Sequence, residues 1–527
     1  MTAADDARHG SDAFMAVDPI AHYAVSCPDK LAIIELPSGR RRSYQNMHAR
    51  VGRLAALLAA RGVGLGDRVG FLAPNSADIL DLTFATWRLG GIVLALNWRL
   101  TASELAVIVV DAEPKIVVYD AELADTASAL QQGTRVDLWL ETHGDGSDSA
   151  LERALDDTGE TVLDAVSHPL DRQCMLMYSS GTTGTPKGVI ITHGMLLFSA
   201  VAGVSPGLVT RHSVSLAAMP LFHIAGMNVS CLPALAIGGT TVVMRAFEPK
   251  AVLAAISDPH LGVTHLFAVP SAFTVLMHHP DAESADYGRL VTVLAGAETV
   301  PKPLVEWWLQ RGVAIQEGYG LTETAAQGCM LAREEVRERV GSAGKPLIHS
   351  RMKIMVDERT EAAPDEPGEI WIKGAVVTPG YWNRPEATRD AFHDGWFRTG
   401  DIGRRDADGY VFIQDRLKDM YVSGGENVYP AEVEHVLHGI DAIAEVAVIG
   451  VPDERLGQSG CAVVVPKPDR TVDLAMLHKR CDGRLARYKH PQHLVIVEAL
   501  PRNATGKVLK HVLRQRFGRQ GSERRGA

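Results

Sequence analysis

The chain has 527 residues, of which 46% are hydrophobic and 22% charged, and its formal net charge is −10. This composition is typical of a globular protein with large buried cores, and it excludes a disordered chain, a collagen and a disulfide-rich miniprotein. The length predicts about three or four domain-sized units, and the acidic balance argues against a nucleic-acid-binding protein.

The N-terminal part alternates helical and strand patterns. Apolar spacing and turn residues predict helices over 43–61, 76–88 and 102–111, and strands over 67–72, 91–96 and 115–119. Strands that alternate with helices indicate βαβ units and a mostly parallel sheet. Residues 127–169 are polar and irregular, and they predict a mobile connection.

A second βαβ run covers residues 189–316. Within it, residues 213–244 contain no Asp, Glu, Lys or Arg, and this uncharged stretch is long enough to span a bilayer. Pro220, Asn228, Pro233 and the pair Gly238–Gly239 interrupt this stretch, so it predicts a strand, a loop, a helix and a strand of a buried core. Further strands are expected at 240–244, 265–269, 291–294 and 313–316.

The pattern changes after the second run. Residues 353–414 contain short strands and turns, such as 369–373 and 410–413, and they predict a small β-rich part. A charged connector at 415–419 precedes helices expected at 431–437 and 474–485 and strands expected at 446–449, 462–465 and 493–497. The predicted fold class is therefore α/β, with a large N-terminal region (1–416) and a small mobile α+β C-terminal domain (417–527).

The chain ends and the cysteines indicate the compartment. The N-terminus is acidic and polar and lacks the apolar segment of a secretory signal. The basic stretch 514–525 predicts a frayed, solvated terminus. No C-x-x-C pair is present, so no zinc site is predicted, and a reduced cytoplasmic location is expected. The six cysteines are Cys27, Cys174, Cys231, Cys329, Cys461 and Cys481.

The strongest local signal is the segment YSSGTTGTPKG at residues 178–188. Its three glycines let backbone amides approach an anion, its five hydroxyl residues add donors, and Lys187 adds a positive charge. The segment is not a Walker loop, because Lys187 lies between Pro186 and Gly188. We predict a polyphosphate-binding loop here; the alternative is a flexible surface turn.

A second signal, EGYGLTET at 317–324, follows the strand expected at 313–316. Ligands of open α/β sheets bind at the carboxyl ends of strands. Tyr319 offers an aromatic face to a base, Thr322 a donor to a phosphate, and Glu323 an oxygen ligand to Mg²⁺. The alternative is a plain turn between a strand and a helix.

Two weaker signals lie nearer the C-terminus. In GWFRTGD, Asp401 is suited to accept hydrogen bonds from two ribose hydroxyls, and Arg416 would add a donor. In PRNATGKV, the turn residues present Lys507 on a loop. Each motif alone is also compatible with a surface turn, a salt bridge or a solvated charge.

Taken together, the motifs resemble those of the adenylate-forming superfamily, which includes acyl-CoA synthetases, adenylation domains of nonribosomal peptide synthetases and luciferases. SSGTTGTPKG, YGLTET, WFRTGD, DRLKDMYVSGGENVYPAEVE and PRNATGKVLK occur in the order and approximate spacing of that superfamily over nearly the whole chain. The tracts YWNRPEATRDAF, ENVYPAEVE and RLARYKHP are most similar to bacterial fatty-acyl or medium-chain acyl-CoA ligases.

The resemblance implies a two-step reaction that uses ATP, Mg²⁺ and CoA. A carboxylate attacks the α-phosphorus of ATP to give an acyl-adenylate and pyrophosphate, and the thiol of CoA then displaces AMP. It also implies that Thr322 contacts phosphate, Glu323 holds Mg²⁺, and Lys507 contacts the acyl oxygen and the α-phosphate. The residues implied to bind nucleotide and CoA are Ser179, Ser180, Gly181, Thr182, Thr183, Gly184, Thr185, Lys187, Gly296, Ala297, Glu298, Glu317, Gly318, Tyr319, Asp401, Arg416, Gly424 and Gly425.

The resemblance further implies that the small domain rotates about a hinge at Lys418, which withdraws Lys507 and presents a CoA tunnel near Ser423, Gly424 and Gly425. In PLFHIAG, His223 matches a gate beside the substrate carboxylate; the alternative is a packed core histidine. The other implied pocket walls carry no charge, which favours an apolar acid over an amino acid. These walls are Met227, Val269, Ala272, Phe273, Ala295 and residues 325–328.

We therefore expect an ATP-dependent acid–CoA ligase for a fatty or other apolar acid. Three alternatives stay open: a ligase for an aromatic acid of the hydroxycinnamate or benzoate type, a freestanding adenylating enzyme that loads a carrier protein, and a non-catalytic nucleotide-binding module. The expected partners are small molecules, with no nucleic acid and no transmembrane segment. The oligomeric state is left open, a homo-oligomer included.

Overall fold

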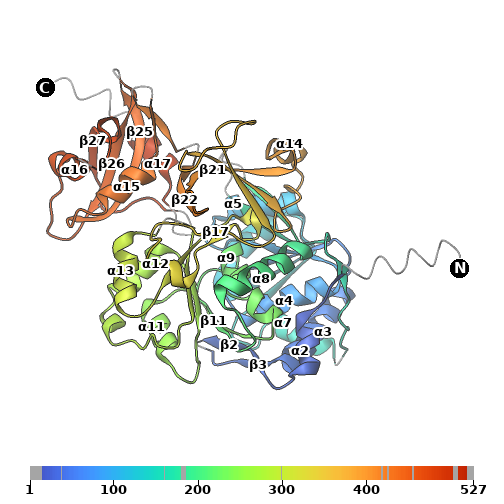
Figure 1. The fold of residues 1–527 in the computed structure, drawn as a ribbon. Helices are drawn as coiled ribbons and strands as arrows, with labels where there is room; N and C mark the ends of the chain where they lie inside the picture. The colour runs from blue at the N-terminus through green and yellow to red at the C-terminus, as the bar shows by residue number, and fades with distance from the viewer. Residues whose placement is uncertain are drawn as a thin grey trace, which may run out of the picture.

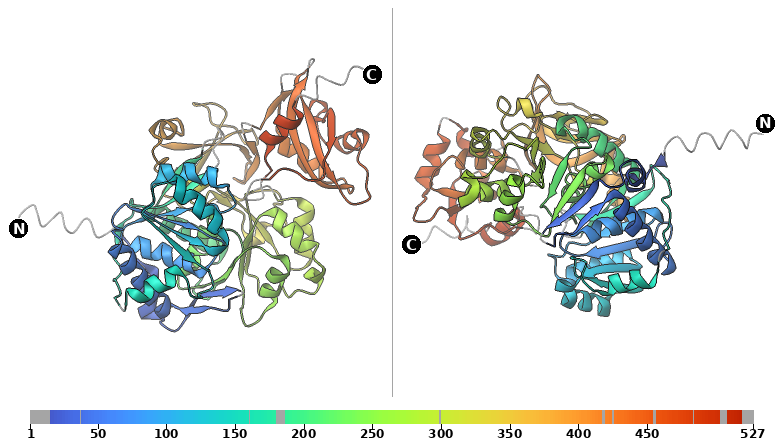
Figure 2. Two further views of the ribbon diagram at one scale, coloured as in Figure 1. Left: turned by 180° about the vertical axis from the view of Figure 1, so that it is seen from behind. Right: turned by 90° about the horizontal axis from the view of Figure 1, so that it is seen from below.

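Three large sheets and one two-stranded sheet, with their helices, form the described N-terminal part of the chain, and a smaller unit projects from it at the C-terminal end (Figures 1 and 2). The computed structural model describes residues 15–36, 38–159, 161–179, 186–297, 300–416, 419–423, 426–453, 456–482, 484–502 and 508–518. The predicted α/β class with a separate α+β C-terminal unit is confirmed.

The first sheet has six strands in the order β10-β9-β5-β4-β6-β7. All neighbouring strands are parallel except β10, which runs antiparallel to β9 and forms a hairpin with it. The strands are β4 (Arg68–Leu72), β5 (Ile92–Ala95), β6 (Ile116–Asp120), β7 (Leu138–Thr142), β9 (Gln173–Ser179) and β10 (Lys187–Thr192).

Four of the six α-helices of this part, α2, α3, α5 and α7, begin at side-chain caps that the sequence provides. Ser43 accepts a hydrogen bond from the amide of Asn46 at the start of α3, and Thr101 forms a capping box with Glu104 at the start of α5. The three helices predicted before residue 120 are confirmed. The helices are α2 (Pro19–Ser26), α3 (Tyr44–Ala60), α4 (Ala77–Arg88), α5 (Ala102–Ala112), α6 (Ala124–Gly133) and α7 (Ala150–Asp157), with the short η2 (Ala121–Leu123).

The prediction of an irregular connection over 127–169 is wrong. The segment contains the end of α6, then β7, α7 and β8 (His168–Pro169), which pairs with β1 (Met15–Ala16). Helix α7 begins at the cap Ser149 and buries Leu151 and Leu155, which lie four residues apart. Two apolar residues on one face are enough for a short helix when a core is available, and the polar GDGSDS turn concealed this pattern.

The second sheet has nine strands in the order β17-β16-β15-β14-β13-β11-β12-β2-β3. Strands β13, β14 and β15 are adjacent and parallel, so their carboxyl ends meet at one edge. The strands are β2 (Leu31–Leu36), β3 (Arg41–Ser43), β11 (Val214–Ala217), β12 (Thr240–Met244), β13 (His265–Ala268), β14 (Thr292–Ala295), β15 (Ile315–Tyr319), β16 (Cys329–Met330) and β17 (Lys345–Pro346).

Residues 213–244 form β11, two short helices and β12, whereas the sequence predicted one helix between the two strands. Over the described part of the chain, none of the helices has both the length and the apolar character that crossing a bilayer requires. The helices of this region are α8 (His193–Gly207), α9 (Ile224–Asn228), α10 (Leu232–Ala236), α11 (Pro249–Ser257), α12 (Pro270–Met277) and α13 (Lys302–Gln310), with η3 (Pro280–Glu283), η4 (Thr322–Thr324) and η5 (Arg333–Glu335).

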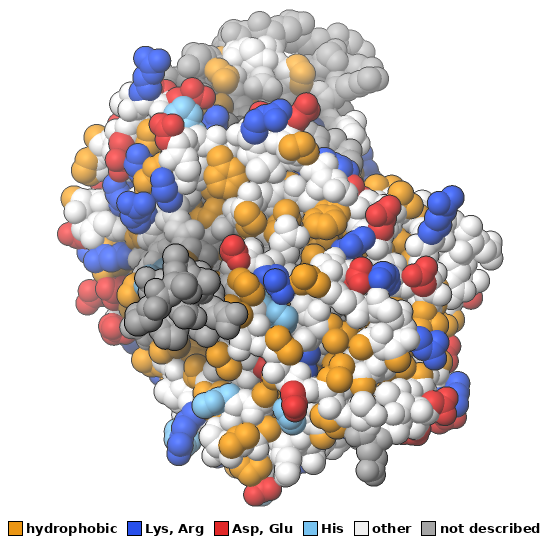
Figure 3. All heavy atoms as spheres, turned by 90° about the vertical axis from the view of Figure 1, so that its right-hand side faces the viewer, with side chains coloured by type: hydrophobic (Ala, Val, Ile, Leu, Met, Phe, Trp, Pro, Cys, Tyr) orange, Lys and Arg blue, Asp and Glu red, His pale blue; other side chains and the backbone are white. Residues whose placement is uncertain are grey.

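The predicted β-rich part forms a third, five-stranded sheet in which β22 pairs with β21. Its elements are β18 (Ser350–Met355), β19 (Gly368–Gly374), α14 (Pro385–Asp390), β20 (Phe392–His393), β21 (Trp396–Arg405) and β22 (Val411–Arg416). Over the face shown in Figure 3, the described Lys and Arg side chains are interspersed with acidic and hydrophobic ones, and they form no continuous basic stripe there.

The C-terminal unit has a sheet of its own and two cores made only of residues beyond position 420. The expected frayed terminus at 514–525 is wrong in its first part, because Arg514 belongs to α17, whose Leu513 is buried, and forms an ion pair with Asp419. The elements are β23 (Tyr421–Ser423), β24 (Glu426–Val428), α15 (Pro430–Leu437), β25 (Ile443–Asp453), β26 (Gly457–Pro466), α16 (Leu474–Cys481), η6 (Arg487–Lys489), β27 (His493–Ile496) and α17 (Lys510–Phe517).

Candidate active site

The predicted phosphate loop joins the two strands of the β9–β10 hairpin. Ser179 and Lys187 are paired across the hairpin, so both ends of the loop are fixed to the first sheet. A Cβ at Gly188 would lie 2.9 Å from the ring of Tyr178, so only glycine fits at this position. Six predicted loop residues lie outside the described residues: Ser180, Gly181, Thr182, Thr183, Gly184 and Thr185.

Tyr381 connects Lys187 with Glu323, although the sequence analysis gave it no role. The ammonium of Lys187 lies 5.3 Å from the centroid of the Tyr381 ring, within reach of a cation–π contact. The Tyr381 hydroxyl donates to Oε1 of Glu323 at 2.9 Å. Two residues predicted from motifs 136 positions apart are therefore brought together by a third.

The backbone around Tyr381 is tied to the hairpin and to η4. The amide of Thr378 donates to the Glu323 carbonyl at 2.7 Å, and the amide of Trp382 donates to the Gly188 carbonyl at 2.7 Å. Within the described residues, no group of three or more His, Cys, Asp and Glu side chains is placed to hold an ion by itself. The carboxylate of Glu323 beside the phosphate loop fits Mg²⁺ that is shared with substrate phosphates, the usual mode of binding for this ion.

The ends of β14 and β15 approach each other closely. A Cβ at Gly296 would lie 3.0 Å from the carbonyl oxygen of Gly318, and Ala297 adopts the left-handed region with φ of 73°. The ends of the two strands that lead to Tyr319 are thus packed backbone against backbone, and a side chain at position 296 would not fit without a shift. Glu298 lies outside the described residues.

Glu317 is buried on β15. Burial raises its pKa to about 8 from an ordinary value of 4.5, although a hydrogen bond with the Val300 backbone acts in the opposite direction. Its Oε2 has no hydrogen-bond partner among the described residues. Near neutral pH the carboxyl is therefore largely protonated, and it can donate a hydrogen bond as well as accept one.

We expect replacement of Glu317 by glutamine to raise the melting temperature in a pH-dependent way. In the unfolded chain Glu317 ionises near pH 4.5, whereas in the folded chain it stays protonated up to about pH 8. The free energy of unfolding of the wild type therefore falls between these pH values. The Glu317→Gln variant lacks this loss of stability. The melting temperature of the variant should therefore exceed that of the wild type by an amount that grows from pH 5 to pH 8 and reaches a few degrees.

Thermal unfolding of both proteins between pH 5 and pH 9 measures this difference. Glu334→Gln, at an exposed carboxylate, is the matched control. A difference between Glu317→Gln and the wild type that stays constant over the whole range would show that burial does not raise the pKa of Glu317.

Tyr319, expected at the adenine, and Asp401, expected at the ribose, lie in direct contact. The Tyr319 hydroxyl donates to Oδ2 of Asp401 at 2.7 Å, and Asp401 is buried on β21. Asp401 and Arg416 are paired across β21 and β22. The backbone of Arg416 is therefore beside Asp401, and its side chain is not among those described.

His223 precedes α9 and packs its ring 4.5 Å from that of Phe222. Burial, together with the nearby Arg99, lowers the pKa of His223 to about 4, so its imidazole is neutral near pH 7. Its Nε2 is buried and has no partner among the described residues. A buried polar atom without a partner is costly, and a substrate carboxylate would supply one.

The predicted acid-pocket segment 325–328 contacts two helices. The Ser199 hydroxyl of α8 donates to the Ala325 carbonyl at 3.2 Å, and the Asn228 amide of α9 donates to the same carbonyl at 2.8 Å. Ala325 and Ala326 both adopt positive φ, which turns the chain sharply after Glu323. This turn fixes α8 close to the residues that follow η4.

For the part of the site that the C-terminal unit is expected to contribute, the structure describes only neighbouring residues. Ser423 is buried at the end of β23. Four residues of the sequence analysis, Lys418, Gly424, Gly425 and Lys507, lie outside the described residues.

Comparisons with known proteins cover almost the whole chain. The family model "AMP-binding enzyme" matches residues 20–382, and "AMP-binding enzyme C-terminal domain" matches residues 432–507. The chain is 40% identical over 480 residues to a feruloyl-CoA synthase from Amycolatopsis sp, covering 91% of this chain and 95% of the relative. It is 36% identical over 499 residues to the long-chain-fatty-acid–CoA ligase FadD13 from Mycobacterium tuberculosis, covering 94% and 97%.

A solved structure with a similar fold is O-succinylbenzoate coenzyme A synthetase (MenE) from Bacillus subtilis in complex with ATP and magnesium ion. Its TM-score is 0.85 at 31% sequence identity, over 95% of this chain and 100% of that one.

Proposed function

We infer the reaction of this chain from its family. The chain belongs to the AMP-binding enzyme family and is an acid–CoA ligase of the adenylate-forming superfamily. The enzyme joins a carboxylic acid to CoA at the expense of ATP, releases AMP and diphosphate, and uses Mg²⁺. The observation that supports this reaction best is the Lys187–Tyr381–Glu323 contact, taken with the Tyr319–Asp401 pair, since the two groups suit the two ends of one nucleotide.

In the first step, we propose that the acid carboxylate attacks the α-phosphorus and that diphosphate leaves. The carboxylate is already ionised near neutral pH, so the protein needs no general base. Lys187 and the loop 179–187 bind the β- and γ-phosphates, and Thr322 contacts phosphate. Mg²⁺ neutralises charge on the phosphates when it is bound, and Glu323 would hold it.

We propose that the remaining residues position the two ends of the adenylate. Gly296, Ala297, Glu298 and the segment 317–319 enclose the adenine, while Asp401 and Arg416 hold the ribose. The neutral His223 donates Nε2–H to the substrate carboxylate, which would give this buried atom a partner. Lys507 contacts the acyl oxygen and the α-phosphate in this step.

We propose that the chain divides into an adenylating domain, 1–416, and a C-terminal domain, 417–527, joined by a hinge at Lys418. The separate cores beyond residue 420 support this division. Rotation about the hinge would withdraw Lys507 after the first step and present the CoA path near Ser423, Gly424 and Gly425. The CoA thiol then displaces AMP.

The substrate proposed is an acid with an apolar tail, either fatty or aromatic. The pocket walls expected from the sequence are uncharged, so the ammonium group of an amino acid would have no acidic partner. The aromatic candidate is favoured by the similarity to a feruloyl-CoA synthase, and the fatty candidate by the similarity to a fatty-acid–CoA ligase.

We expect CoA thioesters from apolar acids and none from amino acids. The test measures AMP and acyl-CoA in parallel for fatty acids, benzoates, cinnamates and amino acids, with ATP, Mg²⁺ and CoA present. AMP and thioester should form in equal amounts. An acid-dependent release of diphosphate without any CoA thioester would instead favour an enzyme that loads a carrier protein.

We place the enzyme in the cytoplasm. All six cysteines are free thiols in the structure, which suits a reducing compartment.

A further inference from the structure

The C-terminal end of α8 is held by one polar side chain from each of three neighbouring strands. Nε2 of His265 on β13 lies 2.9 Å from the Gly207 carbonyl oxygen, and the Thr292 hydroxyl on β14 donates to the same oxygen at 2.6 Å. The side-chain amide of Gln316 on β15 donates to the Pro206 carbonyl at 2.9 Å. We call these three residues the α8 clamp.

The hydrogen bonds of the clamp fix the orientation of the Gln316 amide. Its Nε2 donates to two carbonyl oxygens, those of Pro206 and Leu331, so the nitrogen must face them. The other amide atom, Oε1, is buried and has no donor among the described residues, and the whole residue is 0% exposed. A buried acceptor without a donor is costly, and it therefore points to a ligand that supplies one.

One face of α8 runs from the predicted acid-pocket segment to the clamp. Ser199, Gly203 and Pro206 are four and three residues apart, so they share this face. Ser199 contacts Ala325 at one end, and Pro206 contacts Gln316 at the other. Gly203 between them is buried, yet a Cβ built on it would meet no neighbour closer than Nε2 of Gln327 at 4.0 Å.

The clamp limits the length of the space along this face of α8, between Ser199 and Pro206. The seven residues from Ser199 to Pro206 span about 10 Å along the helix. The three residues from Gln316 to Tyr319, where β15 ends, also span about 10 Å. Gly318 and Gln316 alternate to the same face of β15. A Cβ built on Gly318 would lie 3.1 Å from Cδ1 of Leu294, so this leucine borders the route between the clamp and the reaction centre.

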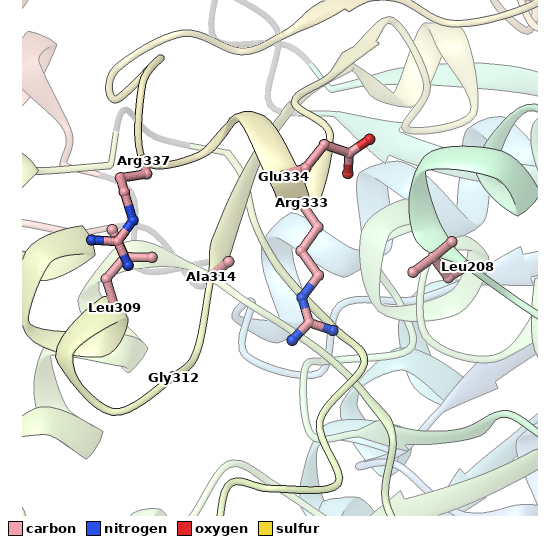
Figure 4. Close-up of a pocket in the computed structure, with 7 residues that line it drawn as sticks. All are labelled: Leu208, Leu309, Gly312, Ala314, Arg333, Glu334 and Arg337. Carbon is pink, nitrogen blue, oxygen red and sulfur yellow. The ribbon is translucent and has the colours of Figure 1, made fainter.

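A surface hollow of about 340 Å³ lies on the other side of the clamp. Leu208 directly follows Gly207, and Ala314 precedes Gln316 by two residues, so both lining residues lie beyond the clamp. Figure 4 shows Arg333 between Ala314 and Leu208 in this hollow. The clamp thus lies between the hollow and the carboxyl ends of the strands.

We propose that His265, Thr292 and Gln316 form the closed floor of the acid pocket, and that Oε1 of Gln316 accepts a hydrogen bond from a hydroxyl at the far end of an aromatic acid. This inference rests on the proposed function, because it assigns the substrate class of the same site. It makes Gln316 the residue that determines specificity and selects hydroxylated aryl acids, such as a 4-hydroxycinnamate, over long-chain fatty acids.

The dimensions agree with this substrate class. A membrane-lipid acyl chain spans half of a hydrocarbon core of about 30 Å, or about 15 Å, and so exceeds the depth set by the clamp. A single ring on a three-carbon arm is shorter than such a chain. A site built to hydrogen-bond a substrate hydroxyl rejects the analogue without it, because the protein acceptor is then left unpaired.

The first test uses the wild-type enzyme and compares kcat/KM for 4-hydroxycinnamate, cinnamate, octanoate and hexadecanoate in thioester formation. We expect 4-hydroxycinnamate to exceed cinnamate by about tenfold to a hundredfold, and hexadecanoate to react far more slowly than octanoate. Equal values for 4-hydroxycinnamate and cinnamate, or efficient use of hexadecanoate, would overturn the proposal without any variant.

Two variants test separately whether Gln316 accepts the hydrogen bond of the substrate hydroxyl and whether it limits the length of the acid. Gln316→Met keeps the length of the side chain but lacks the acceptor, so the preference for the hydroxylated acid should disappear while hexadecanoate stays a poor substrate. Gln316→Ala shortens the side chain and so opens the floor toward the hollow. The kcat/KM for hexadecanoate should therefore rise at least tenfold relative to that for octanoate. Melting temperature and ATP affinity establish that both variants are folded.

The outcomes distinguish the floor from the function. If no acid supports ATP-dependent AMP release by the wild type, the proposed function fails. If apolar acids react but Gln316→Met keeps the wild-type preference for the hydroxyl, only the proposed floor fails.

Discussion

We expect the Lys507→Ala variant to form acyl-adenylate about a hundredfold to a thousandfold more slowly than the wild type. A lysine directed at the α-phosphate stabilises negative charge that spreads in the transition state, and removal of one such stabiliser typically has an effect of this size. The second half-reaction should be largely unaffected, because we propose that in that step the C-terminal domain presents the CoA path instead of Lys507.

The measurement separates the half-reactions. Acid-dependent exchange of labelled pyrophosphate into ATP reports adenylation, and thioester formation from chemically prepared acyl-AMP reports the second step. Lys467→Ala is the matched control, since this lysine lies on the surface of the same unit and pairs with Asp441. Equal losses in both half-reactions of Lys507→Ala would contradict the movement of Lys507 between the two steps.

We expect the Glu323→Gln variant to lose about a hundredfold or more in adenylation, because it removes the carboxylate proposed for Mg²⁺. Tyr381→Phe should have a smaller effect, about tenfold, since residues that orient a metal ligand typically contribute on this scale. The phenylalanine ring keeps the contact with Lys187 but no longer donates to Glu323.

Nucleotide binding supplies a readout that is independent of turnover. ATP affinity is measured by displacement of a fluorescent nucleotide, with Mg²⁺ and with a chelator. The gain in affinity that Mg²⁺ gives the wild type should shrink in Tyr381→Phe and nearly vanish in Glu323→Gln, while affinities in chelator stay similar. An undiminished Mg²⁺ effect in Glu323→Gln would exclude this residue as the ligand.

The positions of the chemical motifs could be predicted because each follows a local pattern. The glycine-rich loop is recognisable from composition alone, and EGYGLTET is recognisable from its place after a strand. Asp401 and Arg416 were expected together, and their pairing across β21 and β22 places their backbones side by side. Such features depend on residues near one another in the sequence or on adjacent strands.

The features missed depend on contacts between distant segments. Tyr381 lies in a tract that the sequence analysis noted only for its similarity to relatives, and its link to Lys187 and Glu323 exists only in the folded chain. The α8 clamp likewise joins three strands to one helix end, and no local pattern marks Gln316 among other strand residues. Helix α7 was missed for a different reason, since its two buried leucines follow a strongly polar turn.

The central claim is that this chain makes an acyl-adenylate before it makes a thioester. The most direct measurement is exchange of labelled pyrophosphate into ATP by the wild type with Mg²⁺ and an apolar acid, in the absence of CoA. The account predicts exchange that requires the acid and that competes with thioester formation when CoA is added. An absence of exchange with every acid that yields a thioester would contradict it.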